Sequence, residues 1–197
     1  MDSFRYVLAL LVVVVTPPAI VLWYAIHPFA RFWRRLGAAG TYAALGLPTL
    51  VLFGVLFRWR DRLLSVDYGT RWPLVGLAVA CLAGAVTIAL KRRRLLTFAV
   101  LAGLPELSPE KYPPKLLQEG LYARVRHPRY VELMMWLAGY SLIANHLAAY
   151  VVTLLSIPGI WLVVVMEERE LRERFGEAWV EYSRRVPRFV PRWRAPS

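Results

Sequence analysis

Five long apolar runs constrain the fold of this chain more than any other feature of its sequence. They extend from about Phe4 to Ile26, Ala38 to Phe57, Pro73 to Leu90, Tyr130 to Ile143 and Leu147 to Met166. An α-helix needs ~20 apolar residues to cross a hydrocarbon core of ~30 Å, and only the fourth run is clearly shorter. We therefore predict an all-α polytopic membrane protein with about five transmembrane helices, of which the last two form a tight hairpin.

The composition agrees with a membrane protein without disulfides or metal. Hydrophobic residues make up 58% of the 197 residues, more than a soluble core of this size needs. The single cysteine, Cys81, lies inside the third run, so the sequence predicts neither a disulfide framework nor a thiolate site. The three histidines, His27, His127 and His146, lack metal-ligand spacing, and we expect no metal cofactor.

The first run resembles a signal peptide in its position but not in its length. Its apolar stretch is too long and contains no small-residue cleavage site, so we expect a retained helix. Pro17 and Pro18 are expected to kink that helix, which a membrane tolerates when neighbouring groups satisfy the freed carbonyls.

The net charge of +12 has a distribution that indicates membrane orientation. Segments 28–37, 91–129 and 167–197 carry most of the 25 Lys and Arg residues. By the positive-inside rule these segments are cytoplasmic, which predicts an outside N-terminus and a cytoplasmic C-terminus. This pattern favours membrane lipids over nucleic acid as partners.

Two segments flanking the last apolar runs have less regular patterns. Residues 95–104 are apolar but span only half a membrane, so they are expected to lie in the interface or to re-enter, and the prolines of 105–114 predict an irregular connector. After Glu167 the pattern predicts one amphipathic C-terminal helix, with apolar residues at helical spacing at Leu171, Phe175, Ala178, Trp179 and Tyr182.

The sequence GLYARVRHPRY at 120–130 contains the first candidate site. Pro128 is expected as the first residue of the fourth helix, with His127 near its N-cap. The N–H groups at a helix N-terminus favour an anion, and Arg126 would add a charge-assisted contact. The rings of Tyr122 and Tyr130 would stack on a base or face a cation.

The acidic pair Glu167-Glu168 closes the fifth run and forms the second candidate site. Glu168 has Arg172 four residues later, whereas Glu167 has a leucine there and therefore no basic partner on its own helix face. An unpaired carboxylate at the membrane edge suggests a function. The bland interpretation is that Arg126, His127 and the tyrosines are ordinary interfacial anchors.

Together these motifs resemble the cofactor end of the integral-membrane methyltransferases, the family of isoprenylcysteine carboxyl methyltransferase and phospholipid N-methyltransferases. The resemblance covers roughly residues 115–191 and includes, in order, Gly120, Tyr122, the RHP triplet 126–128, Tyr130, Glu167-Glu168, Phe175-Gly176, Tyr182 and VPRFVP at 186–191. It implies S-adenosylmethionine as cofactor and a lipid or amphiphilic substrate. A GxG loop, as found in soluble nucleotide-binding folds, is absent from the sequence.

The resemblance also implies which residues form the site in a single membrane domain of residues 1–197. Residues 1–90 would supply three spans on the substrate side, and residues 91–197 the cofactor-binding loop, the hairpin and the C-terminal helix. The cofactor-binding residues would be Lys115, Leu116, Leu117, Tyr122, Arg126, His127, Pro128, Arg129, Tyr130 and Glu167.

Two departures from the family pattern bear on the substrate. Val163 stands where the isoprenylcysteine enzymes have an arginine, which argues against a prenylcysteine carboxylate. Glu132 stands where many members have a small residue, and it either contacts a headgroup or pairs with Arg129. Glu168, Glu132 and His127 are the candidates for a general base, if the acceptor arrives protonated.

Three alternative functions remain open from the sequence. A related enzyme would methylate a small thiol in a closed, short cavity. An NADPH-dependent reductase of related membrane architecture would instead bind a nicotinamide cofactor. A non-catalytic lipid-binding protein would keep the motifs without turnover.

Overall fold

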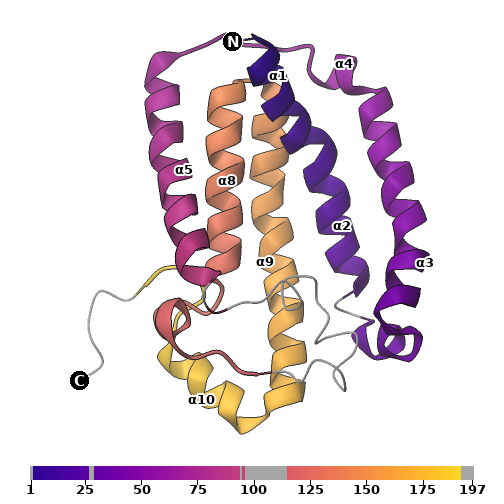
Figure 1. The fold of residues 1–197 in the computed structure, drawn as a ribbon, viewed down its shortest axis with the longest axis vertical. Helices are drawn as coiled ribbons and strands as arrows, with labels where there is room; N and C mark the ends of the chain where they lie inside the picture. Colours follow the sequence, from indigo (N-terminus) through magenta and orange to yellow (C-terminus); the bar gives the residue numbers. More distant parts are fainter. Residues whose placement is uncertain (1, 27–28, 94, 96–114, 192–197) are drawn as a thin grey trace.

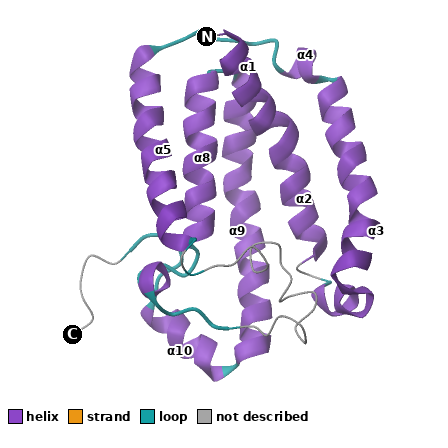
Figure 2. Ribbon diagram, viewed as in Figure 1, coloured by secondary structure: helices purple, strands orange, loops and turns teal. Residues whose placement is uncertain are grey.

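The computed structural model describes residues 2–26, 29–93, 95 and 115–191, and these form a bundle of helices (Figure 1). The described residues contain no strand and only one isolated β-bridge, between Asp67 and His146 (Figure 2). Residues 96–104, which make up nearly all of the predicted interfacial or re-entrant segment, lie outside the described residues, as does the whole proline-rich connector 105–114. The prediction of an all-α fold is confirmed.

The first predicted span is a continuous helical segment that changes its winding before the prolines. It consists of α1 (Asp2–Leu10), a π-helical turn η1 (Leu11–Val15) and α2 (Thr16–Ile26). Pro17 and Pro18 have no N–H to donate to the carbonyls one turn earlier, and the π-helical turn occupies that position. The change in winding thus accommodates the two prolines within one helical segment.

The second span is α3 (Ala30–Arg58), which begins earlier than the sequence predicted. Gly37 interrupts it with a φ of 67° and a ψ of 177°, a conformation that favours glycine. The buried Thr41 hydroxyl donates to the Gly37 carbonyl at 2.7 Å and stabilises this kink. Residues 30–36 of the expected inner loop 28–37 are therefore helical. The predicted start of the span at Ala38 lies directly after the kink at Gly37.

A short helix α4 (Arg60–Leu63) leads to the third span, α5 (Trp72–Arg92). The last two spans are α8 (Pro128–Ala144) and α9 (Leu147–Phe175). They form the tight hairpin that the sequence predicted, because Asn145 adopts the left-handed conformation with a φ of 52° and donates its N–H to the Ser141 carbonyl at 2.8 Å.

Four segments of the described chain are long and apolar enough to cross a membrane: Asp2–Ile26, Phe32–Arg58, Trp72–Arg92 and Leu147–Phe175. The remaining predicted span, the fourth, is α8, which has 17 residues and is about 25 Å long at the helical rise, somewhat less than the hydrocarbon core. It lies between α5 and α9 (Figure 1). The chain is a multi-pass membrane protein.

Helix α8 is the centre of the packing. It packs along α5 on one side and against α1 and α9 on the other. At Gly139, α8 and α5 approach each other so closely that a Cβ atom on this residue would lie 2.5 Å from the Leu82 side chain. Small residues at such crossings let membrane helices approach each other, and Ala9, Ala144 and Ala149 are fully buried in the neighbouring core.

The C-terminal part of the fold differs from the single amphipathic helix that was predicted. Helix α9 continues nine residues beyond Met166 and ends at Phe175. Gly176, with a φ of 55°, breaks the helix, and a separate amphipathic helix α10 (Glu177–Arg185) follows. Glu167 and Glu168 therefore lie inside α9 rather than at its end, and α10 turns back beneath the bundle (Figure 1).

Candidate functional site

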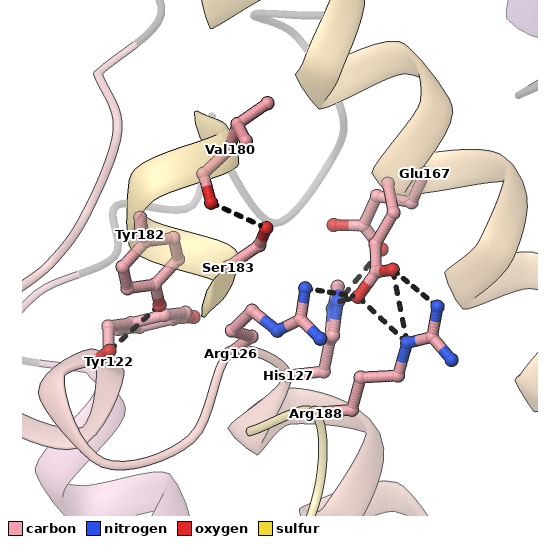
Figure 3. A network of polar contacts seen from close by, with 9 residues as sticks. Tyr122, Arg126, His127, Glu167, Val180, Tyr182, Ser183 and Arg188 are labelled. Atoms are coloured by element: carbon pink, nitrogen blue, oxygen red, sulfur yellow. Dashed lines mark hydrogen bonds and ion pairs between the residues drawn. The ribbon is translucent and has the colours of Figure 1, made fainter. Parts of the chain in front are cut away.

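The candidate site lies at the end of the bundle where α8 begins. A short 3-10 turn η2 (Gly120–Ala123) leads into the RHP triplet, and Pro128 is the first residue of α8 with His127 at its N-cap, as predicted. The His127 side chain makes no capping hydrogen bond. It is buried and points instead toward the acidic pair of α9 (Figure 3).

Glu168 is surrounded by three basic side chains. Its Oε1 lies 3.1 Å from Arg126 Nη1 and 3.1 Å from His127 Nε2, while Arg188 donates from Nη2 to Oε2 at 2.8 Å (Figure 3). The carboxylate is only 11% exposed, so these charge-assisted contacts are strong. Rather than the alternative partner Arg172 four residues later, Glu168 contacts these three residues and so joins α9 to the start of α8 and to the C-terminal segment.

Glu167 lies beside this network with a different environment. Tyr130 donates its hydroxyl to Glu167 Oε2 at 2.8 Å, and His127 Nδ1 lies 3.9 Å from the same oxygen. The Glu167 side chain is 29% exposed, more than twice as much as that of Glu168. The two adjacent carboxylates therefore differ: one is enclosed by cations, and the other is held mainly by a phenol and is accessible.

The C-terminal segment after α10 completes the site. The carbonyls of Pro187 and Arg188 accept the backbone N–H groups of Arg126 and His127 at 2.9 and 3.1 Å. These contacts fix the RHP triplet in place beneath α8. Sequence reasoning did not assign Arg188 to the site, although it lies in the VPRFVP motif, because 20 residues separate it from its carboxylate partner.

An aromatic cluster supports the other side of the RHP segment. Trp179 and Tyr182 of α10 pack with Val186 and Leu116, and Tyr182 donates its hydroxyl to the Tyr122 carbonyl at 2.8 Å. Burial raises the pKa of Tyr182 to about 12. Burial, together with the nearby charge of Glu167, also raises the pKa of Tyr122. Both phenols therefore stay protonated near neutral pH.

The remaining predicted residues lie at the margins of this network. Lys115 is exposed, with its ammonium 3.5 Å from Glu119, whereas Leu116 packs in the aromatic cluster and Leu117 is partly buried. Arg129 lies over the ring of Trp23, with 5.1 Å between the guanidinium carbon and the ring centroid.

Glu132 does not make the expected pair with Arg129. Its two carboxylate oxygens accept from Arg92 Nε at 2.7 Å and Arg92 Nη2 at 3.0 Å. Both side chains are about nine-tenths buried between α5 and α8. The sequence could not indicate this partner, because 40 residues and the loop between the two helices separate it from Glu132.

Three curated proteins resemble part of the chain. A protein-S-isoprenylcysteine O-methyltransferase B from Arabidopsis thaliana is 33% identical over 78 residues, which are 39% of this chain and 40% of that protein. The Schizosaccharomyces pombe protein-S-isoprenylcysteine O-methyltransferase is 34% identical over 80 residues, 39% of this chain and 33% of that protein.

The name of a third relative gives methanethiol as the methyl acceptor. Methanethiol S-methyltransferase 1 from Bradyrhizobium diazoefficiens is 34% identical over 87 residues, 43% of this chain and 29% of that protein. The chain spans less than half the length of each of these curated relatives. No solved structure matches it significantly.

The family itself follows from a broader match that includes α8, the hairpin and the acidic pair. The sequence model described as phospholipid methyltransferase matches residues 74–178, which is more than half of the chain. This region begins in α5 and ends in α10, so it contains the RHP triplet and both glutamates of the site. The chain therefore belongs to the phospholipid methyltransferase family.

Proposed function

We propose that this protein transfers a methyl group from S-adenosylmethionine to a lipid-like or amphiphilic acceptor, and that the cofactor binds where α8 begins. One observation carries the proposal. The fold brings the RHP triplet and Tyr130 together with the acidic pair of α9, 37 residues away, and leaves Glu167 accessible beside them.

The donor set fits the chemistry of this cofactor. S-adenosylmethionine has a carboxylate, an amine, ribose hydroxyls and a sulfonium. Arg126 Nε is buried and has no hydrogen-bond partner among the described residues, so it suits the carboxylate. Glu167 suits the amine or the ribose hydroxyls, and the rings of Tyr122 and Tyr130 suit the adenine or the sulfonium. The backbone of Lys115 to Leu117, with Pro128 and Arg129, would line the remainder of the pocket.

When bound, the cofactor supplies a methyl group that its sulfonium already activates for in-line displacement. The chain would then contribute mainly by positioning the two reactants and excluding water. The two guanidinium groups and the imidazole around Glu168 favour a positioning role for this carboxylate over that of a general base. Glu132 is likewise occupied by Arg92, and we assign it no proton-transfer step.

The acceptor class and the orientation are parts of the same proposal. Large apolar side chains on α3 and α5 are exposed on the bundle and suit contact with lipid, as at Leu47, Leu50, Trp72, Leu77 and Val79. An amphiphilic acceptor would enter laterally from that lipid. The basic segments at the end of the bundle where α8 begins favour a cytoplasmic cofactor site. This is the side on which a water-soluble cofactor is available.

The methanethiol relative gives one alternative a specific basis. A small volatile thiol would need no lateral opening to the lipid, and it carries no headgroup for buried polar residues to recognise. Turnover with methanethiol but not with prenyl or phospholipid acceptors would favour this alternative over the lipid-like acceptor.

The experiment that tests the cofactor is a calorimetric titration of S-adenosylmethionine and S-adenosylhomocysteine into the protein purified in detergent. We expect micromolar binding to the wild type and at least tenfold weaker binding to Glu167→Gln, a loss of about 1.4 kcal/mol. Glu181→Gln is the matched control. It makes the same change at an exposed position of α10, where Glu181 is paired with Arg185 at 3.6 Å, and should bind like the wild type.

Parallel titration with NADPH separates the reductase alternative. Binding of NADPH without binding of either sulfur compound would overturn the methyltransferase proposal in favour of a reductase. Absence of binding to all three ligands would favour the non-catalytic lipid-binding alternative, with the RHP and acidic residues serving as anchors.

A further inference from the structure

We propose that Arg92 is an oxyanion-binding residue of this site and holds a carboxylate or phosphate through its Nη1 group. The inference rests on the proposed function, because it assigns a ligand group within the same pocket. Arg92 is the last residue of α5, at the end of the bundle where α8 begins (Figure 1).

Arg92 and Glu132 form a bidentate ion pair. Arg92 uses its Nε and Nη2 edge to bind both oxygens of the carboxylate, at 2.7 and 3.0 Å. A guanidinium is a rigid planar fork with five N–H donors, so the pair leaves Nη1 directed away from Glu132. Glu132 therefore fixes the orientation of Arg92 and leaves one nitrogen available.

The Arg92 Nη1 nitrogen is enclosed by the protein. Nη1 is buried and has no hydrogen-bond partner among the described residues. The Arg92 side chain as a whole is only 11% exposed. A buried, charged donor without a partner is unfavourable, so a position of this kind suits a ligand that accepts hydrogen bonds.

Arg92 lies near the turn that carries Tyr122. Its charge acts on the phenol of Tyr122, which also feels the charges of Glu167 and Arg129. Helix α5 contacts η2, the turn that carries Tyr122. Arg92 on α5 thus lies close to Tyr122, one of the cofactor-binding candidates.

An oxyanion there would come from one of two sources. S-adenosylmethionine carries a carboxylate on its methionine part, and an acidic amphiphilic acceptor carries a carboxylate or phosphate at its headgroup. Both would bind a guanidinium Nη1 through the same charge-assisted contact. Two probe pairs distinguish them: S-adenosylhomocysteine against 5′-methylthioadenosine, which lacks the carboxylate, and farnesylthiopropionic acid against its uncharged amide.

Arg92→Lys is the informative variant. A lysine ammonium keeps the charge and the ion pair with Glu132, but it has no third nitrogen to offer a ligand. The unfolding temperature should therefore stay close to that of the wild type. Arg93→Lys, one residue later on the exposed end of α5, is the matched control. The double variant Arg92→Met/Glu132→Leu replaces the buried pair with apolar side chains and should also fold.

The expected result is a selective loss of at least tenfold in the affinity of one anionic probe. If the cofactor is the source, Arg92→Lys and the double variant bind S-adenosylhomocysteine more weakly but 5′-methylthioadenosine as the wild type does. If the acceptor is the source, they lose affinity for the farnesyl acid but not for its amide. Either result supports the assignment.

Three outcomes overturn it in distinguishable ways. Unchanged affinity for both acids, or an equal loss for the acids and their neutral counterparts, contradicts the inference alone, because the wild type still binds S-adenosylhomocysteine. Failure of the wild type itself to bind that compound removes the proposed function, and the inference with it.

Discussion

The two ends of the bundle both contain buried charge, but they use it differently. At the site end, Glu168 is held by three side chains from two segments, and one buried nitrogen each of Arg92 and Arg126 has no hydrogen-bond partner among the described residues. At the opposite end, a far-end cluster of Arg5, Asp67, Asn145 and His146 is joined largely to backbone, and Arg5 Nε is likewise buried without a hydrogen-bond partner among the described residues.

The contacts of the far-end cluster connect the helix ends to the loop before α5. Arg5 donates to the Ala144 carbonyl at 2.9 Å and pairs with Asp67. Asn145 Nδ2 donates to the Gly69 carbonyl at 2.7 Å, and His146 Nδ1 lies 3.2 Å from the Leu64 carbonyl. Because such contacts satisfy backbone groups of the protein itself, they serve stability, whereas the donors at the site end suit a ligand.

The largest expected effect breaks the far-end cluster. Arg5→Leu removes a side chain that is almost fully buried, together with its bond to the Ala144 carbonyl and its pair with Asp67. We expect the protein to lose about 3 kcal/mol of stability, as measured by thermal unfolding in detergent. Binding of S-adenosylhomocysteine to the folded protein should stay within twofold of the wild type.

Phe4→Leu is the control for this change, since it introduces the same residue on an exposed part of α1 and should leave the unfolding temperature unchanged. A tenfold loss of cofactor affinity in folded Arg5→Leu would contradict the division between the two ends, because it would couple the far-end cluster to the site.

The next effect concerns the site end. Arg188→Gln removes one of the two guanidinium groups beside Glu168 but keeps the backbone carbonyl that accepts from His127. Since Arg188 is partly exposed and Arg126 and His127 remain, we expect only a small change in stability. Affinity for S-adenosylhomocysteine should fall about tenfold, or about 1.4 kcal/mol, because Arg126 is then drawn more strongly to Glu168.

Arg188→Lys should recover most of that affinity, and Arg185→Gln, on the exposed end of α10, should not change it. Calorimetric titration measures all three variants. A large fall in unfolding temperature for Arg188→Gln without loss of affinity would mean that the site end, like the far end, mainly stabilises the fold.

The sequence predicted the fold well because membrane helices have a strong local signal. Apolar runs located the spans, and Pro128 marked the start of α8 to the residue. The errors lie where two local signals compete. At Gly176 the apolar spacing continues on both sides, so the pattern predicted one helix, although a glycine with positive φ ends α9 there.

The site was only partly predictable because its contacts depend on tertiary structure. The RHP triplet and Glu167 were found from motifs, but the partners of the carboxylates were not. Spacing along one helix suggested Arg172 for Glu168, and proximity suggested Arg129 for Glu132. The actual partners, Arg188 and Arg92, come from other segments and become neighbours only when the bundle packs.

The smallest expected effect sharpens the comparison by testing a stabilising contact within the site end. Tyr182→Phe removes only the hydroxyl that donates to the Tyr122 carbonyl at 2.8 Å. We expect a loss of about 1 kcal/mol of stability below pH 9. The affinity for S-adenosylhomocysteine should change little, because the ring that packs against Trp179 remains.

The pH dependence of Tyr182→Phe gives the decisive readout. A tyrosine titrates near pH 10 in the unfolded chain, whereas burial raises the pKa of Tyr182 to about 12 in the folded protein. Folding therefore favours the protonated phenol, and this contribution to stability is complete below pH 10 and lost as the pH rises toward 12. Tyr182→Phe lacks this part of the decline. The unfolding temperature of the wild type should therefore fall toward that of the variant over this range. Parallel pH profiles for the two proteins would contradict a buried, protonated Tyr182 and would place α10 away from the RHP segment.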